Sequence, residues 1–446
     1  MNASLQAIRS SLEGAIPAIM ATCAADGTPN VAYISQVYYV DDRHVALSFQ
    51  FFNKTHLNIR ANPHATVLVL DPATVAFHRL HLRYLRCETD GPLFEGMKAQ
   101  LAGIASHTGM GSVFRLLGAD VYEVRAIEAV EGELIEGPPP RTGLLNAARR
   151  TSERLSRCTA LDELLEAVLA CMADHMNVRH AMVLLTDSAS ARLYTVASSG
   201  YPVSGVGSEI EPGHGVIGVA ASAGTPVRIS HMTQAALYSH AVRSSLREGD
   251  APLALDTDIP FPGLAEPHSQ LAVPIVAMGR GLGVLFVESP DDMAFSYEDE
   301  DLLTAIAGHL GAAMELLKAS DEQLAAEPPA PAPALAQQPP LQLRRFGTND
   351  SVFIGDSYLI KGVAGAIFWK LLRDHVQGGR TEFSNRELRL DPAIRLPDVA
   401  DNLEARLLLL ARRLQEQSPH IRIEKTGRGR FRLVVTRRVE LVDIAG

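Results

Sequence analysis

The chain has 446 residues, of which 47% are hydrophobic and 21% are charged, with a net charge of −10 and four scattered cysteines. A single core rarely serves more than about 300 residues, so this length predicts about three domains, and the composition excludes a largely disordered chain or a disulfide framework. No secretory leader and no apolar run of roughly 18 residues is evident, so we expect a protein of the reducing cytoplasm without a membrane span.

Two proline-rich stretches divide the chain. The sequence GPPPRTG at 137–143 ends a run of strands before a new amphipathic helix, and residues 325–340 have the composition of a semi-rigid polyproline II spacer. We therefore predict a multidomain α+β protein with units at 1–137, 142–320 and 343–446, the last two joined by a Pro/Ala-rich linker over 321–342.

The first unit is rich in strand signals. An opening amphipathic helix precedes two hairpins, whose turns we place at Asp26-Gly27 and Asp41-Asp42. A short helix ends before Pro63, and it is followed by a buried strand, a strand in HRLHLRYLRCE, a helix, and a last alternating strand in ADVYEVRAIEAVEG. The pattern predicts a β-rich unit built from hairpins.

This order of elements, together with LSFQFFNKTHLNIRANPHATVLV at 47–69, resembles the flavin-binding split barrel of the pyridoxamine 5′-phosphate oxidase superfamily. The resemblance implies a split β-barrel that binds FMN, with a basic, hydroxyl-bearing turn around the flavin phosphate. A cation and a hydroxyl donor near a helix N-terminus suit a phosphate dianion. The matching cofactor-binding positions are Ser48, Gln50, Lys54, Thr55, Arg79 and Arg83.

One position departs from the pattern of this family. His56, which is largely neutral at pH 7, stands where more basic relatives carry Arg or Lys. A split barrel without a cofactor, used for dimerisation or as a scaffold, is therefore the alternative. Haem is disfavoured as a cofactor, because the histidines of this unit include no pair with a recognisable ligand spacing.

The middle unit begins with an apolar stripe at helical spacing, followed by strands in HAMVLLTD and RLYTVASSG. A glycine turn in EPGHGVIGVAASAGTPVRIS enters a helix and then a strand. SQLAVPIVAMGRGLGVLFVES predicts a hairpin, and FSYEDEDLLTAIAGHLGAAMELLK predicts a closing helix with an acidic first turn. These pieces resemble a GAF domain over about residues 144–318. The resemblance implies an α/β GAF sandwich that encloses a small effector in a pocket lined from about 195 to 275.

The sequence leaves the identity of the effector open. Glu288 stands where cyclic-nucleotide-binding GAF domains carry the Asn of an Asn-Lys pair, which disfavours a cyclic nucleotide. Phe295, Asp299 and Glu300 match the rest of that motif, and we interpret them as a core residue and a helix start. No cysteine lies in the later pocket-forming stretch, which argues against an attached bilin. The long excursion over 233–268 is expected to act as a ligand-gated lid.

The last unit is basic, whereas the rest of the chain is acidic. Residues 341–446 hold 19 Lys and Arg against 13 Asp and Glu, a net of +6, and residues 1–340 hold 22 against 38, a net of −16. Such an asymmetry is expected when only the end of a chain meets a polyanion.

This last unit begins with short strands and a helix in VAGAIFWKLLRDHVQGG. A second helix is capped by Ser384 with Glu387 at the capping-box position, a third lies in DNLEARLLLLARRLQE, and IRIEKTGRGRFRLVV predicts a hairpin. These elements resemble the winged-helix effector domain of bacterial response regulators over about residues 345–436. The resemblance implies a winged helix whose third helix enters the major groove of DNA while the hairpin contacts the backbone.

The third helix and the hairpin supply the candidates for DNA contact. On the helix, three side chains fall within about 40° of one another at roughly 100° per residue, and their types can read guanine and adenine edges. Cations on the hairpin suit phosphates. These DNA-binding candidates are Asn402, Arg406 and Arg413 on the helix and Lys425, Arg428 and Arg430 on the hairpin.

Leu408 and Leu409 interrupt the outward side of this helix, and Glu404 is unfavourable beside phosphate, so a helix that binds protein is the alternative. We expect a homodimeric bacterial regulator of the cytoplasm, in which a small effector controls DNA binding. The alternatives are an FMN-dependent oxidoreductase that the GAF domain regulates and a signalling adaptor that binds protein. No catalytic triad, P-loop or metal-ligand pair is evident, so we name no catalytic or metal-binding residue.

Overall fold

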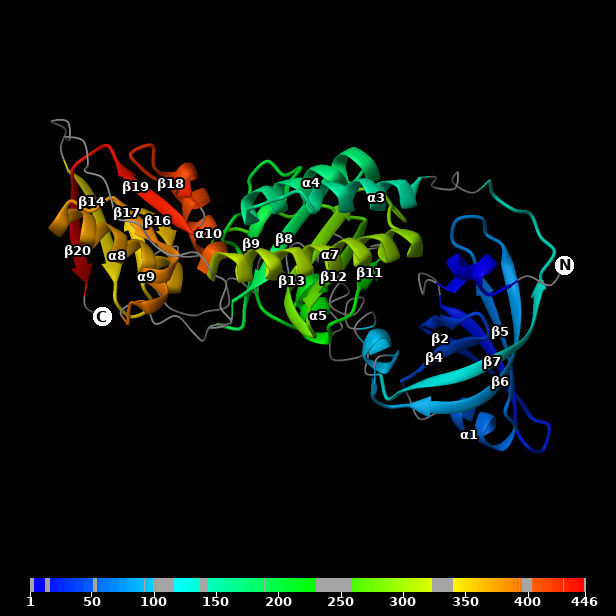
Figure 1. Ribbon diagram of the computed structural model, residues 1–446. Coiled ribbons are helices and arrows are strands. Elements are labelled where there is room, and N and C mark those ends of the chain that lie inside the picture. The colour runs from blue at the N-terminus through cyan, green and yellow to red at the C-terminus, as the bar shows by residue number, and fades with distance from the viewer. Residues whose placement is uncertain are drawn as a thin grey trace.

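The computed structural model describes residues 4–12, 17–50, 54–91, 93–98, 116–136, 143–187, 190–229, 259–322, 340–392, 403–427 and 429–444, with the single residues 101 and 394. Three units follow one another in space as they do in the sequence, with residues 143–322 between the other two (Figure 1). Asn402, Arg428 and most of the predicted lid lie outside the described residues.

The first unit is an antiparallel sheet of seven strands in the order β2-β1-β5-β6-β7-β4-β3. Buried and exposed side chains alternate along β1, because successive residues of a strand point to opposite faces. The predicted hairpin turn at Asp26-Gly27 is present, and Gly27 has a φ of 89°, which favours glycine. The elements are η1 (Gln6–Leu12), β1 (Ala18–Cys23), β2 (Pro29–Ile34), β3 (Val37–Asp41), β4 (His44–Phe49), α1 (Lys54–Ala61), β5 (His64–Leu70), β6 (Phe77–Glu88) and β7 (Gly118–Ala129).

The middle unit is a six-stranded sheet in the order β10-β9-β8-β13-β12-β11, with helices on both faces (Figure 1). On β13, Leu285 and Val287 pack toward α3, α4 and α7, whereas Val284 and Phe286 pack toward α5. Both faces of the sheet are therefore apolar cores. The elements are α3 (Leu144–Leu155), α4 (Leu161–Met176), β8 (His180–Thr186), β9 (Leu193–Ser199), β10 (Glu209–Ile210), α5 (Gly215–Ala223), β11 (Val227–Ile229), β12 (Ser269–Ala277), β13 (Arg280–Ser289) and α7 (Tyr297–Glu322).

The long helix α7 begins where the first and middle units meet. The hydroxyl of Tyr297 donates a hydrogen bond to the carbonyl oxygen of Leu12 at 3.0 Å, and Arg9 pairs with Asp301 at 3.1 Å. By length and composition, α7 is the one helix in the described part of the chain that could cross a membrane, over Tyr297–Ala319, and 39% of its most apolar 18-residue window is buried in the protein. It packs along β12 and α3, as a core helix does.

The described part of the C-terminal unit has two small sheets, in the orders β16-β15-β14-β20 and β17-β19-β18, and three helices. The predicted cap is present, since the hydroxyl of Ser384 accepts a hydrogen bond from the N–H of Glu387 at 3.4 Å. The elements are β14 (Leu341–Phe346), β15 (Ser351–Ile354), β16 (Ser357–Ile360), α8 (Gly362–Gly378), β17 (Glu382–Ser384), α9 (Asn385–Leu390), α10 (Leu403–Gln417), β18 (Ile421–Gly427), β19 (Arg430–Val435) and β20 (Val439–Ile444).

The third helix of this unit, α10, packs against the middle unit. It contacts α4 and β9, beside which it lies in Figure 1. Leu409 and Leu410 are 7% and 0% exposed, and a continuous apolar core joins side chains of α4, β9 and α10. The sequence predicts this helix, but it does not predict that a preceding domain covers one of its faces.

Candidate functional site

Polar residues predicted on β4 and α1 line a hollow of about 70 Å³ in the first sheet. Ser48 lies on β4, Gln50 follows that strand, and Thr55 is in the first turn of α1, so one short connection brings the three side chains together. All three are buried. Apolar walls come from Met20, Leu47, Ile59 and Tyr122.

Hydrogen bonds between neutral groups hold the polar side of this hollow. The Nε2 atom of Gln50 donates to the hydroxyl of Ser48 at 3.3 Å, and Nδ2 of Asn30 donates to the hydroxyl of Thr55 at 2.9 Å. The Oε1 atom of Gln50 is buried without a hydrogen-bond partner. Because an unpartnered buried acceptor costs free energy, a ligand that donates a hydrogen bond to it would be favoured.

A carboxyl group also lines the hollow. Asp120 on β7 is 5% exposed, and its Oδ2 atom lies 3.4 Å from Nδ1 of His56, whose ring stacks on Phe49. Burial raises the pKa of Asp120, while hydrogen bonding by Cys87 and the charge of His56 oppose that rise. Burial and the contact with Asp120 raise the pKa of Cys87 to about 12. Cys87 is therefore a thiol at neutral pH and not an activated nucleophile.

The hollow fits the phosphate of FMN only in part. Lys54 is exposed at the start of α1, but none of the described residues that line the hollow is Lys or Arg. Arg79 and Arg83 lie on β6 opposite Glu128 and Glu123, and Arg79 pairs with Glu128 at 3.1 Å. A buried carboxyl in the hollow also opposes a dianion. The strand register places both arginines opposite carboxylates of β7, and neither lines the hollow, so their part in a flavin site stays a prediction.

A buried acid and a buried amide interrupt the apolar α5 face of the middle sheet. Glu288 on β13 is 2% exposed, and Nε2 of Gln270, opposite it on β12, donates to its Oε2 atom at 3.0 Å. The N–H of Leu264 donates to Oε1 of Glu288 at 2.8 Å, whereas Oε1 of Gln270 is buried without a partner. Burial raises the pKa of Glu288, and hydrogen bonds from Leu264, Gln270 and Tyr201 oppose that rise.

Two rings adjoin this pair. His180 is opposite Glu288 in the register of β8 and β13, and its ring centroid lies 5.4 Å from that of Tyr201. Sequence reasoning treated Glu288 only as a departure from a nucleotide-binding motif. A carboxyl group inside the apolar run GVLFVES was the signal that could have marked it as a site residue.

The remainder of that motif is structural, as expected. Phe295 is 4% exposed and belongs to the core. The carboxylate of Asp299 accepts a hydrogen bond from the N–H of Ser296 at 2.8 Å at the start of α7. Glu300 pairs with the buried Arg228 at 2.9 Å.

Arg406 and Arg413, the helix residues predicted to read bases, are buried. Arg406 is 4% exposed and pairs with Asp187 of the middle unit. Arg413 is 6% exposed, and its Nε atom donates to the carbonyl oxygen of Leu359 at 3.1 Å. In this arrangement of the domains, the middle unit and the C-terminal unit itself cover that side of α10, and DNA contact by Arg406 and Arg413 stays a prediction.

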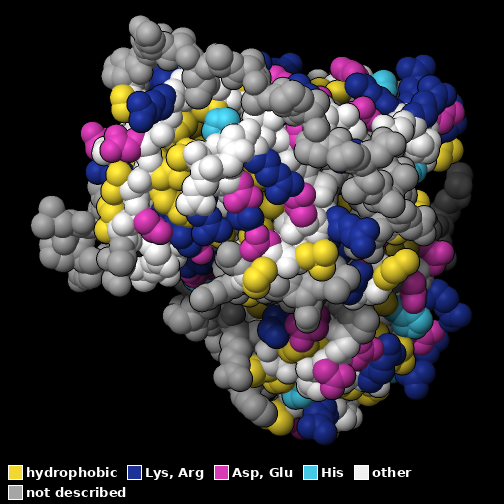
Figure 2. All heavy atoms as spheres, turned by 60° about the vertical axis from the view of Figure 1, so that its left-hand side comes forward, with side chains coloured by type: hydrophobic (Ala, Val, Ile, Leu, Met, Phe, Trp, Pro, Cys, Tyr) yellow, Lys and Arg dark blue, Asp and Glu magenta, His cyan; other side chains and the backbone are white. Residues whose placement is uncertain are grey.

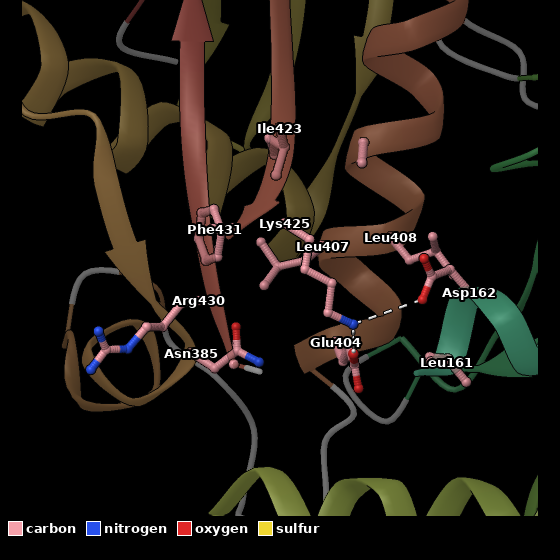
Figure 3. A pocket seen from close by; sticks show the side chains of 12 residues that line it. Leu161, Asp162, Asn385, Glu404, Leu407, Leu408, Ile423, Lys425, Arg430 and Phe431 are labelled. Atoms are coloured by element: carbon pink, nitrogen blue, oxygen red, sulfur yellow. Dashed lines mark hydrogen bonds and ion pairs between the residues drawn. The ribbon is translucent and has the colours of Figure 1, made fainter. Parts of the chain in front are cut away.

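Lys425 and Arg430 line a hollow of about 220 Å³ between β18, β19, α10 and α4 (Figure 3). The Nζ atom of Lys425 lies 3.3 Å from Glu404 and 3.8 Å from Asp162 of the middle unit. Figure 3 shows Lys425 directed toward these two carboxylates and Arg430 directed away from them. Apolar walls come from Leu407, Leu408 and Phe431.

Comparisons with known proteins match two stretches of this chain. Residues 4–125 match the family described as pyridoxamine 5′-phosphate oxidase, and residues 158–315 match the GAF domain family. No curated protein matches the chain. The winged-helix assignment of the C-terminal unit therefore stays a prediction.

Each of the similar solved structures resembles only one of the two matched units. The GAF domain of a phosphoenolpyruvate-protein phosphotransferase from Coxiella burnetii is 18% identical, covers 40% of this chain and 97% of its own, and has a TM-score of 0.32. A free methionine-R-sulfoxide reductase from Neisseria meningitidis is 18% identical over 42% and 98%, with a TM-score of 0.31. An FMN-binding protein from Syntrophomonas wolfei is 19% identical over 28% and 88%, with a TM-score of 0.23. From the two family matches, the chain carries a pyridoxamine 5′-phosphate oxidase-like domain followed by a GAF domain, which confirms the first two resemblances seen in the sequence.

Proposed function

We propose that the chain is a cytoplasmic bacterial regulator in which the GAF domain binds a small polar effector and the C-terminal unit, as a winged helix, binds DNA. The two matched domains suggest small-molecule sensing. The DNA-binding output is supported by the order of helices and hairpin over residues 362–435 and by the net charge of +6 on residues 341–446.

A homodimer is part of this proposal, and exposed side chains of β2 support it. Val31 and Tyr33 are 67% and 80% exposed on this edge strand of the first sheet. Large apolar side chains on an edge strand favour association, because a second copy would remove them from water.

The observation that carries the sensing function is the pair of Glu288 and Gln270. A buried carboxyl group is costly unless it is neutral or fully hydrogen-bonded, and the unpartnered Oε1 atom of Gln270 adds to that cost. A ligand that donates hydrogen bonds, such as an amine or an amide, would give Oε1 of Gln270 a partner and could donate a further bond to Glu288. We therefore propose effectors of this class.

Thermal unfolding of the full chain with a panel of amines, amides and matched carboxylic acids tests the effector class. A ligand at 100 times its Kd stabilises the folded protein by about 2.7 kcal/mol, so a true effector should raise the Tm by several degrees. Glu288→Gln should abolish this rise, whereas Glu266→Gln, at an exposed position, should keep it. Equal rises in the two variants would exclude Glu288 from the site.

Binding of the full chain to genomic fragments around its own gene tests the output. Each phosphate contact by Lys or Arg releases counterions, so the affinity should fall steeply as salt rises. An affinity that does not change with salt concentration would contradict the proposed DNA contact.

A second candidate, an FMN-dependent oxidoreductase regulated by its GAF domain, is favoured by the hollow that gathers Ser48, Gln50 and Thr55. FMN would supply redox chemistry there, while these three residues would hydrogen-bond it. Titration of the full chain with FMN tests this function. Quenching of flavin fluorescence that Thr55→Ala weakens, and that Thr348→Ala at an exposed position does not, would support it. If the chain does not quench flavin fluorescence, it does not bind FMN, and the proposal of an FMN-dependent oxidoreductase is excluded.

A further inference from the structure

Cations of the C-terminal unit that face the GAF domain are met by carboxylates of that domain. Among the described residues, four ion pairs cross the interface, and each joins a Lys or Arg of the C-terminal unit to an Asp or Glu of the GAF domain. The charges of the two surfaces are thus complementary. The pairs are Arg406 with Asp187, Lys361 with Glu209 at 3.2 Å, Arg412 with Glu166 at 3.7 Å and Lys425 with Asp162 at 3.8 Å.

The helix α10 is seated closely on the GAF domain. The Nη1 atom of Arg412 donates to the carbonyl oxygen of Val196 on β9 at 2.5 Å, and the hydroxyl of Ser204 donates to Glu416 at 2.5 Å. Gly207 lies beside the helix, where an added side chain would contact Arg413 and Leu409. Protein groups therefore already occupy the side of α10 that faces β9.

We propose that the GAF domain autoinhibits the C-terminal unit by occupying the face of α10 that carries Arg406 and Arg413, the basic face, which the phosphates and bases of DNA would otherwise contact. The inference rests on the proposed DNA-binding function. A guanidinium buried against Asp187 cannot reach a groove of DNA, so docking and DNA binding through this face exclude each other. Figure 2, which turns the C-terminal side forward, shows Lys and Arg interspersed with Asp and Glu on the visible face rather than gathered in one basic surface.

The two leucines that break the pattern of a DNA-reading helix fit this second role. Leu409 is 7% exposed and lies close to Gly207, and Leu408 lines the hollow beside α4 (Figure 3). Burial in this interface removes apolar surface that an isolated winged helix would expose to water. The departure seen in the sequence therefore marks the docking face.

Autoinhibition requires docking to be reversible, and the outer ion pairs of the interface suit this requirement. The side chains of Lys425 and Glu166 are 44% and 76% exposed, so their ion pairs are weak and screened by salt, and a polyanion competes for the same cations. The strand β9 belongs to the same sheet as β13, which carries Glu288. An effector that binds the docked and the undocked protein with different affinities would therefore shift the docking equilibrium.

The test uses the full chain with two interface carboxylates neutralised, Asp187→Asn with Glu209→Gln. The matched control, Asp174→Asn with Glu298→Gln, removes the same charge from exposed positions of the GAF domain. We measure hydrogen exchange of α10 and β9, and DNA affinity at fixed salt. The interface variant should exchange faster at both elements and bind DNA at least about tenfold more tightly, and the control should match the wild type.

Each failure identifies a different error. Unchanged exchange at α10 and β9 would overturn the docking contact. Faster exchange with equal DNA affinity would overturn autoinhibition while the DNA output stands. Faster exchange without DNA binding by either protein would refute the DNA output and support contact with a protein. Asp187→Arg combined with Arg406→Asp should restore the slow exchange that Asp187→Arg loses, which separates lost docking from misfolding.

Discussion

The hollow of the first sheet and the basic face of α10 were both predicted to bind anions, yet their cations are placed differently. In the hollow, the predicted arginines are elsewhere, and Asp120 is among the lining residues. On α10, Arg406 and Arg413 are in place, but groups of the protein already bind them. Residue type and spacing thus predict what a surface can bind, whereas the tertiary neighbours decide whether it is available.

The largest effect that tests this contrast is expected at Arg406. Arg406→Ala removes a cation whose side chain is 5% exposed. The substitution also deprives Asp187, whose side chain is 18% exposed, of this ion-pair partner. Because a largely buried ion pair is broken from one side, we expect the free energy of unfolding of the C-terminal unit to fall by about 3 kcal/mol. Urea denaturation followed by fluorescence of Trp369, the sole tryptophan of the chain and a residue of α8, measures it.

Arg422→Ala is the matched control in the same unit. Arg422 pairs with Glu424 at 2.5 Å, but its side chain is 57% exposed, so the loss should stay below about 1 kcal/mol. Equal losses in the two variants would mean that α10 is open to solvent, and the contrast with the hollow would disappear.

Local contacts were predictable from the sequence, and distant ones were not. Ser48, Gln50 and Thr55 could be placed together because a strand end and the next helix start are close in the chain. The partner of Arg79 depends on the register of β6 and β7, across 49 residues, and that of Arg406 lies 219 residues away. Periodicity identifies the helices and strands, but it does not fix strand register or the docking of one domain on another.

A smaller effect is expected at Asp120, where a shift in pKa links the stability of the folded protein to pH. Burial raises the pKa of Asp120 above its unfolded value of 3.8, so the folded protein favours the neutral carboxyl. That stabilisation is present below the unfolded pKa and is lost as the pH rises through the folded pKa. Asp120→Asn carries no charge, so its stability relative to the wild type should increase as the pH rises from about 4 to 7.

Calorimetry of the full chain across this pH range checks the prediction at Asp120. Asp90→Asn, at an exposed position near the same sheet, serves as the control and should show no such gain. A difference between Asp120→Asn and the wild type that does not change with pH would show that the hollow tolerates a carboxylate. The hollow, like the basic face of α10, would then accept a charged side chain, and the two sites would differ less than the structure indicates.

The smallest effect on stability is expected at Arg79 of the first unit, which, like Arg406, was predicted to contact an anionic ligand. Arg79 and Glu128 are 47% and 51% exposed, so Arg79→Ala should cost less than about 0.5 kcal/mol, as measured by calorimetry. If the chain binds FMN, Arg79→Ala should also leave the Kd unchanged, because its neighbours on β7 hold the side chain away from the hollow. A tenfold loss of FMN affinity would instead show that Arg79 belongs to the flavin site. Because Arg79 does not line the hollow of its own chain, the site would then have to be completed by a second copy, and only the isolated chain would lack cations there.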